Sequence, residues 1–261
     1  MSSPCVRIEV DGPVCTIVLD RPSVRNAVDG PMAVELLRAF EGFEADAALQ
    51  VAVLSGAGGH FCAGADLTSV GDPVRRHELD PEGGGSGPMG PTRMALSKPL
   101  IAAVSGYAVA GGLELALLAD LRVMERDAVF GVFCRRWGVP LIDGGTVRLP
   151  RIVGRGSALD IILTGRKVPA DECHRIGLCE RLVPDGESRA AAEALAHEIA
   201  RFPQGCMRAD RRSVFLQEGL SELDGLRSEW ACSSAMVERE GAAGAVRFSS
   251  GKGRHGEFGD I

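Results

Sequence analysis

The sequence predicts an α/β protein with mostly parallel strands, followed by a helical C-terminal region. Apolar residues make up 45% of the 261 residues, which is enough for a substantial core. Short β-forming runs alternate with helical segments as far as about Val183, a pattern typical of βα repeats. From Ser188 onward the sequence has helical periodicity and contains no β-forming run.

The N-terminal segment predicts a hairpin followed by a helix. Two β-forming runs, Val6–Val10 and Val14–Leu19, flank the pair Asp11-Gly12, and a D-G pair in this place favours a tight turn. Asp29 stands immediately before Gly30-Pro31, an arrangement typical of an N-cap followed by an early helical proline. We therefore expect the first helix to begin at this point.

Further strands are predicted at Val51–Leu54, Leu100–Val104 and Leu121–Met124, and a helix at Gly111–Ala119. The run Pro99–Ala119 is about as long as a membrane span. Its glycines and its single glutamate favour a strand, a turn and a buried helix, so we expect no association with a membrane.

The chain divides, on this pattern, into a core of residues 1–187 and a helical region of residues 188–261 that packs on the core or on another subunit. Pro81–Pro91 is the only low-complexity segment. Its glycines and prolines cannot build a core, and its position between two candidate site loops leaves two interpretations open, a passive linker or a lid on the substrate side.

Charge and cysteine usage exclude several classes. The net charge of -6 argues against a nucleic-acid partner, which favours a basic surface. None of the eight cysteines forms a C-x-x-C pair, so no metal site is expected. The N-terminus has no charged segment followed by an apolar one, and we expect reduced thiols and a cytoplasmic location.

Glu114 is the only charged residue in Pro99–Ala119. Burial of an ionised carboxylate costs several kcal/mol, so such a group has a partner, a shifted pKa or a function. Gly111 and Gly112 precede it and indicate a turn that begins a helix. This arrangement predicts a catalytic acid or base beside the N-terminus of a helix.

Two loops of small residues follow predicted strands, Phe61–Asp66 and Tyr107–Gly112. Small residues allow a ligand to approach the backbone closely, and each loop leads into a predicted helix with unpaired N–H groups. Side by side, the loops would form an oxyanion hole. The alternative, that both are only tight connections, stays open from the spacing alone.

These two loops, F-C-A-G-A-D-L at Phe61–Leu67 and A-G-G-L-E-L-A at Ala110–Ala116, resemble those of the crotonase superfamily, the enoyl-CoA hydratases and isomerases. The resemblance continues over nearly the whole chain, in segments listed here: Leu19–Val28, Phe130–Pro140, Asp143–Gly154 and Leu163–Leu178. It implies a crotonase-like spiral of ββα turns with a C-terminal helical oligomerisation region, assembled as a homotrimer or hexamer.

The resemblance also implies an acyl-CoA thioester as the ligand and no cofactor, because coenzyme A is part of the substrate. It places the thioester oxygen against the backbone N–H groups of Ala65 and Gly111, which stabilise an enolate. Substrate-binding positions carried over from the family are Arg25, Ala63, Asp66, Leu67 and Gly112. Asp66 is also expected to cap the helix that follows it.

Hydratases of this family use two glutamates to hold and activate a water molecule. Glu114 matches the first, but the second position is occupied by Cys134. A thiol is a poor substitute for a carboxylate, and a small buried apolar role for Cys134 is the other interpretation. Asp143 is an alternative second acid, one residue beyond the family's aspartate position at Ile142; it is also predicted as a helix cap.

Two classes of function therefore stay open. The first is an enzyme that hydrates or isomerises an enoyl-CoA, in fatty-acid or related acyl-CoA breakdown, with Glu114 as acid and base and with Asp143 or Cys134 as its partner. The second is a weakly catalytic oligomer that binds acyl-CoA, which the missing second glutamate favours. The sequence does not define the acyl group.

Overall fold

The structure of the protein, a computed structural model, describes residues 4–253. The chain forms two compact units that divide after Ala196. The division falls inside helix α5 (Ser188–Ala200), whose first part is linked to strands of the first unit. Ser188 donates a hydrogen bond to Glu125, and Glu193 accepts one from Thr16.

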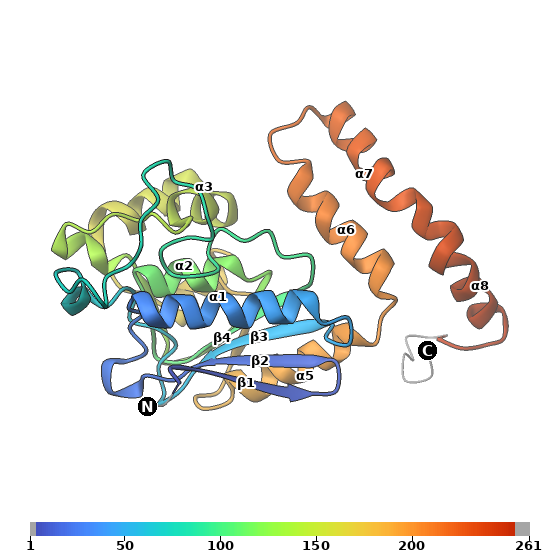
Figure 1. Cartoon of the computed structure of the whole chain (residues 1–261). Helices are drawn as coiled ribbons and strands as arrows, with labels where there is room; N and C mark the ends of the chain where they lie inside the picture. Colours follow the sequence, from blue (N-terminus) through green and yellow to red (C-terminus); the bar gives the residue numbers. More distant parts are fainter. Residues whose placement is uncertain (1–3, 254–261) are drawn as a thin grey trace. The chain divides into compact units, whose positions relative to one another are not determined.

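A six-stranded sheet forms the centre of the first unit (Figure 1). Its strands in spatial order are β1 (Val6–Asp11), β2 (Val14–Leu19), β3 (Val51–Gly56), β4 (Leu100–Val104), β6 (Leu121–Glu125) and β9 (Arg181–Val183). Only β1 and β2 are antiparallel, joined by the predicted hairpin, and every other neighbouring pair is parallel. Because β2, β3 and β4 carry apolar side chains on both faces, these strands are almost fully buried, whereas the edge strands β1 and β9 are exposed or half-buried.

A second, smaller sheet contains β5 (Tyr107–Val109), β7 (Val129–Gly131) and β8 (Val168–Pro169). Cys62 pairs with Ala108 as an isolated bridge next to β5. Successive chain segments thus place one strand in the large sheet and the next in the small one. This repeat carries the loops that follow Cys62 and β5 to the same edge of the fold.

Helices cover these sheets. Figure 1 shows α1 (Gly30–Ala45) lying along the large sheet, against which its stripe of Met32, Leu36, Phe40 and Phe43 is buried. Asp29 caps α1 as predicted, accepting from the N–H of Met32 at 3.2 Å. The remaining helical elements of the unit are η1 (Pro22–Val24), η2 (Leu67–Ser69), α2 (Gly111–Leu118), η3 (Phe133–Trp137), α3 (Gly145–Thr164) and α4 (Ala170–Arg175).

The second unit is helical, as the sequence predicts. Helices α6 (Gln204–Leu216) and α7 (Glu222–Met236) form a hairpin, and a π-helical turn, η4 (Val237–Gly241), leads from α7 into α8 (Ala242–Ser249) (Figure 1). Ser221 caps α7 by accepting from the N–H of Asp224. Within residues 4–253, no helix is long and apolar enough to cross a membrane.

Candidate active site

The two loops of small residues meet in the structure. The N–H of Cys62 donates to Tyr107 and the N–H of Val109 donates to Cys62, which joins the loops as neighbouring strands. The contact beyond is close: a Cβ atom on Gly64 would lie 3.0 Å from the N of Gly111, and one on Gly112 would lie 2.1 Å from the carbonyl oxygen of Cys62. Glycine is therefore required at the point where the loops pack together.

The backbone N–H groups of Ala65 and Gly111 lie on these adjoining loops. Neither N–H donates a hydrogen bond to any residue in the described part of the chain. Both residues line the same cavity, which has a volume of about 1250 Å³. Two unpaired amide donors at one cavity wall are the arrangement that can bind a carbonyl oxygen on which negative charge develops.

Ala110 stands between β5 and α2 with φ 54° and ψ -124°. A non-glycine residue with positive φ is uncommon and carries strain of about 1–3 kcal/mol. The turn at Ala110 begins α2 at Gly111, so that the first N–H groups of the helix are available at the cavity. Local strain at such a point is consistent with a functional constraint.

Glu114 lies on the first turn of α2 and is only 2% exposed. Its Oε1 atom accepts from the N–H of Asp143 at 2.9 Å and from the N–H of Gly145 at 2.8 Å. No described residue donates a hydrogen bond to Oε2. Because Glu114 lines the cavity, one carboxylate oxygen is held in place while the other is available to a ligand.

Burial raises the pKa of Glu114 from its ordinary value of 4.5 to about 7. The N–H of Gly145 opposes this rise, the negative charge of Asp143 adds to it, and the N–H of Asp143 also opposes it. A carboxyl group with a pKa near 7 can both donate and accept a proton at neutral pH. A side chain at Gly145 would crowd this group, since its Cβ would lie 2.9 Å from Oε1.

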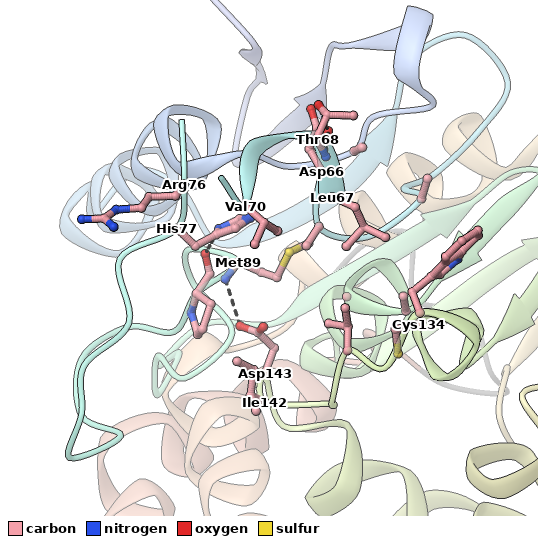
Figure 2. A pocket seen from close by; sticks show the side chains of 18 of the residues that line it. Asp66, Leu67, Thr68, Val70, Arg76, His77, Met89, Cys134, Ile142 and Asp143 are labelled. Atoms are coloured by element: carbon pink, nitrogen blue, oxygen red, sulfur yellow. Dashed lines mark hydrogen bonds between the residues drawn. The ribbon is translucent and has the colours of Figure 1, made fainter. Parts of the chain in front are cut away.

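Asp143, whose backbone N–H binds Glu114, also lines the cavity, and it is 4% exposed. Its Oδ1 accepts from the N–H of Met89 at 2.9 Å (Figure 2). The same oxygen also accepts from the hydroxyl of Thr92. The prediction that Asp143 caps a helix is wrong. Gly144 occupies the N-cap position of α3 without any side-chain cap, because the Asp143 carboxylate is turned toward the segment before β4.

The glycine- and proline-rich segment ends in the cavity wall. Pro88 and Met89 line the cavity, and the Met89 side chain is 1% exposed. A Cβ on Gly111 would lie 2.9 Å from the Met89 sulfur, so this side chain packs directly against the second loop. The C-terminal end of Pro81–Pro91 is thus part of the site, which a passive linker would not be.

Arg148 joins this segment to Asp143. Its guanidinium donates to the carbonyl oxygen of Thr92 at 2.6 Å and to that of Asp143 at 3.1 Å. Sequence reasoning missed Thr92, Met89 and Arg148. For Arg148 a signal was available, because it follows the D-G-G-T motif at helical spacing; nothing in the sequence connects Thr92 with Asp143.

Cys134 also lines the cavity, on η3, and is 6% exposed. Burial raises the pKa of its thiol, and the negative charge of Glu114 raises it further. The group is therefore a neutral thiol at physiological pH and a poor base. The structure thus brings all three predicted catalytic side chains, Glu114, Asp143 and Cys134, to one cavity.

The predicted binding residues fall into two sets. Ala63, Asp66 and Leu67 line the cavity. Gly112 serves the loop contact described above, and Arg25 is exposed beside the cavity, with its guanidinium 5.5 Å from the centre of the Tyr107 ring. The carbonyl oxygen of Arg25 accepts from the N–H of Ala63 at 2.9 Å, which ties its loop to the site.

Asp66 has a structural role. It caps the short 3-10 helix η2, accepting from the N–H of Thr68 at 3.1 Å; the cap is confirmed, although the helix has a single turn. Its carboxylate also pairs with Arg21 at 3.1 Å and Arg75 at 2.7 Å. Burial would raise the pKa of Asp66, but the hydrogen bonds from Thr68 and Arg21 and the charge of Arg21 lower it.

Comparisons with known proteins agree with this geometry. The family model described as Enoyl-CoA hydratase/isomerase matches residues 9–223. The chain is 34% identical over 233 residues to Enoyl-CoA hydratase EchA19 of Mycobacterium tuberculosis, covering 85% of this chain and 84% of that protein. It is 36% identical over 200 residues to Carnitinyl-CoA dehydratase of Proteus mirabilis, covering 76% and 75% of the two chains.

A solved structure supports the same assignment. The crystal structure of an enoyl-CoA hydratase from Mycobacterium tuberculosis H37Rv superposes with a TM-score of 0.88 at 33% identity, over 95% of this chain and 96% of that one. The chain belongs to the enoyl-CoA hydratase/isomerase family, whose enzymes act on acyl-CoA thioesters. The predicted fold class and family are thereby confirmed.

Replacing Glu114 by glutamine is predicted to stabilise the protein at alkaline pH. A carboxyl group whose pKa is higher in the folded state binds more protons when folded, so the free energy of unfolding falls as pH rises from about 4.5 to about 7. Glu114→Gln keeps the acceptor for both N–H groups and removes this loss. We expect a gain of up to about 3 kcal/mol above pH 7 and little change at pH 4.

Urea unfolding of both proteins across this pH range measures the effect. Glu41→Gln is the matched control, because Glu41 is an exposed glutamate on α1. An equal loss of stability for Glu114→Gln at every pH would show that the carboxylate is stabilising when buried, contrary to this account.

Proposed function

We propose that this protein adds water to the double bond of an enoyl-CoA thioester, and removes it in the reverse direction, with Glu114 as the group that exchanges a proton with carbon. The observation that carries this proposal is the state of Glu114: one oxygen is held by two N–H groups, the other is unpartnered at the cavity, and the pKa is about 7. This is the state that general acid–base catalysis at neutral pH requires.

The thioester oxygen accepts, in this proposal, from the N–H groups of Ala65 and Gly111. When a bond forms at the β carbon, negative charge moves onto this oxygen, and the two donors stabilise the enolate. Each such donor typically contributes about 2.7–4 kcal/mol to the transition state. The unpaired condition of both N–H groups supports these roles.

Asp143 is proposed as the partner that hydration requires. Water forms the new C–O bond at the β carbon and its proton passes to Asp143, while Glu114 delivers a proton to the α carbon. Asp143 then releases its proton to solvent, and Glu114 takes up a proton from solvent. Cys134 cannot take the part of Asp143, because a neutral thiol offers neither a base nor two acceptor oxygens.

A second candidate is isomerisation of the double bond, which the thiol at position 134 favours. Moving a double bond needs one carboxylate that takes a proton from one carbon and returns it to another. Glu114 alone suffices for this reaction, and the apolar character of Cys134 would keep water away from the acyl chain.

The remaining assignments are part of the same proposal. Coenzyme A enters past Ala63 and the loop of Arg25, and no further cofactor takes part. The second unit assembles trimers or hexamers, supported by large apolar side chains exposed on its helices: Val214, Phe215, Leu216, Leu223, Leu226, Trp230, Val237, Val246 and Phe248. A cytoplasmic location rests on the cysteine pattern alone.

Glu114→Gln is predicted to lower turnover of enoyl-CoA thioesters by about 100-fold or more, because glutamine cannot donate or accept the proton. Mass spectrometry of the products identifies the reaction, since hydration adds the mass of water and isomerisation leaves the mass unchanged. Full activity in this variant would remove Glu114 from the mechanism, whichever product forms.

Asp143→Asn is predicted to lower hydration by about 100-fold as well, whereas Cys134→Ala changes it little. Thr92→Val removes one of the two donors to Asp143 and is expected to lower kcat more than it raises KM; Thr92→Ser keeps the hydroxyl and restores kcat. Steady-state kinetics of the four variants tests this. A loss in Cys134→Ala with none in Asp143→Asn would assign the second role to the thiol.

The pH dependence separates the two candidate reactions. In hydration Glu114 must carry the proton that it delivers to the α carbon, so kcat/KM falls as pH rises through about 7. In isomerisation Glu114 must first accept a proton, so kcat/KM rises through the same range. A profile that is flat across pH 7 would contradict both mechanisms.

A further inference from the structure

Large apolar side chains that face solvent gather around the cavity. Six of them line it, with exposed fractions between 38% and 78%: Leu67, Val70, Val74, Leu79, Trp137 and Ile142. Solvent-facing apolar residues are common singly, but a group of this size at one cavity marks a place where an apolar partner binds.

These side chains come from two separate segments. One runs from Leu67 to Leu79 and the other from Trp137 to Ile142. Figure 2 shows Leu67 and Val70 on one side of the cavity, with Cys134 and Ile142 on the other. The two segments therefore form facing apolar walls that continue from the carboxylates of the site.

Glu78 is an exposed carboxylate within the first wall, whereas the other charged and polar side chains of that wall are hydrogen-bonded or extend away from the cavity. Asp66 is engaged by Arg21 and Arg75. Both ring nitrogens of His77 lie next to carbonyl oxygens, at 2.8 Å from Pro88 and 3.0 Å from Val28. Figure 2 shows the Arg76 side chain extending away from the space between Leu67 and Asp143.

The cavity has a volume of about 1250 Å³, and in the proposed function it holds the acyl group together with the thioester end of coenzyme A. A four-carbon acyl group would leave most of the apolar wall in contact with water. A larger hydrocarbon removes that surface from water and gains binding free energy with every methylene.

We infer that the substrate is a thioester with a large apolar acyl group, medium- or long-chain in size, held between the walls at Leu67–Leu79 and Trp137–Ile142. This inference rests on the proposed acyl-CoA ligand and defines its substrate class. Coverage of the same side chains by a second copy of the chain is the competing account, and the experiment below separates the two.

The test measures binding, so that it does not depend on turnover. Isothermal titration calorimetry compares the saturated butyryl-, octanoyl- and dodecanoyl-CoA, each kept below the concentration at which it forms micelles. One buried methylene contributes up to about fourfold in affinity, so we expect the Kd of dodecanoyl-CoA to be at least about tenfold below that of butyryl-CoA. Octanoyl-CoA should fall between them.

Substitutions in the two walls test whether these side chains cause the dependence of Kd on acyl chain length. Val74→Ser and Trp137→Ala are expected to weaken the binding of dodecanoyl-CoA severalfold more than the binding of butyryl-CoA. Val10→Ser is the matched control, because Val10 is an exposed valine on β1 that does not line the cavity, and it should leave all three Kd values unchanged.

Several outcomes would overturn the inference. A Kd that does not change with chain length would exclude an apolar acyl site. The same conclusion would follow if Val74→Ser raised the Kd of all three ligands equally. A change of oligomer mass in Val74→Ser, measured by light scattering, would assign these side chains to a subunit interface. By contrast, tight binding without turnover of any enoyl-CoA would refute the proposed reaction and leave the inference standing.

Discussion

The site depends on the two hydrogen bonds that the backbone of Asp143 and Gly145 donates to one oxygen of Glu114. A carboxylate at 2% exposure is unfavourable when ionised, and two N–H donors compensate part of that penalty. The two hydrogen bonds do not compensate the whole penalty, and the pKa of Glu114 is therefore raised to about 7. Since both donors bind the same oxygen, the other remains available to a ligand.

A second constraint surrounds Asp143. The segment that ends at Thr92 holds this carboxylate by the N–H of Met89 and the hydroxyl of Thr92, and Arg148 joins the two backbones. The Met89 side chain meanwhile packs against Gly111. A displacement of this segment would consequently move both the carboxylate of Asp143 and the N–H donor of Gly111.

The environment of Glu114 and the apolar walls act on the same ligand. Burial of Glu114 lowers the local dielectric, which raises the pKa of its carboxyl group and strengthens each hydrogen bond to a developing oxyanion. The solvent-facing side chains of the walls offer apolar surface to a hydrocarbon. An apolar acyl group would complete the exclusion of water, so binding of such a group and proton transfer favour each other in this arrangement.

The sequence by itself determined the fold class, five of the strands, the hairpin at Asp11-Gly12, the cap at Asp29 and the family. These follow from local periodicity, turn chemistry and motifs whose residues are close in the chain. It also singled out Glu114, because one charge in an apolar run is visible without coordinates. Only the tertiary structure decided that Asp143 faces Thr92 and Met89 and leaves the cap position to Gly144. Those contacts join residues 51 and 54 positions apart, and the direction of a side chain across such a distance is set by packing, which no local pattern encodes.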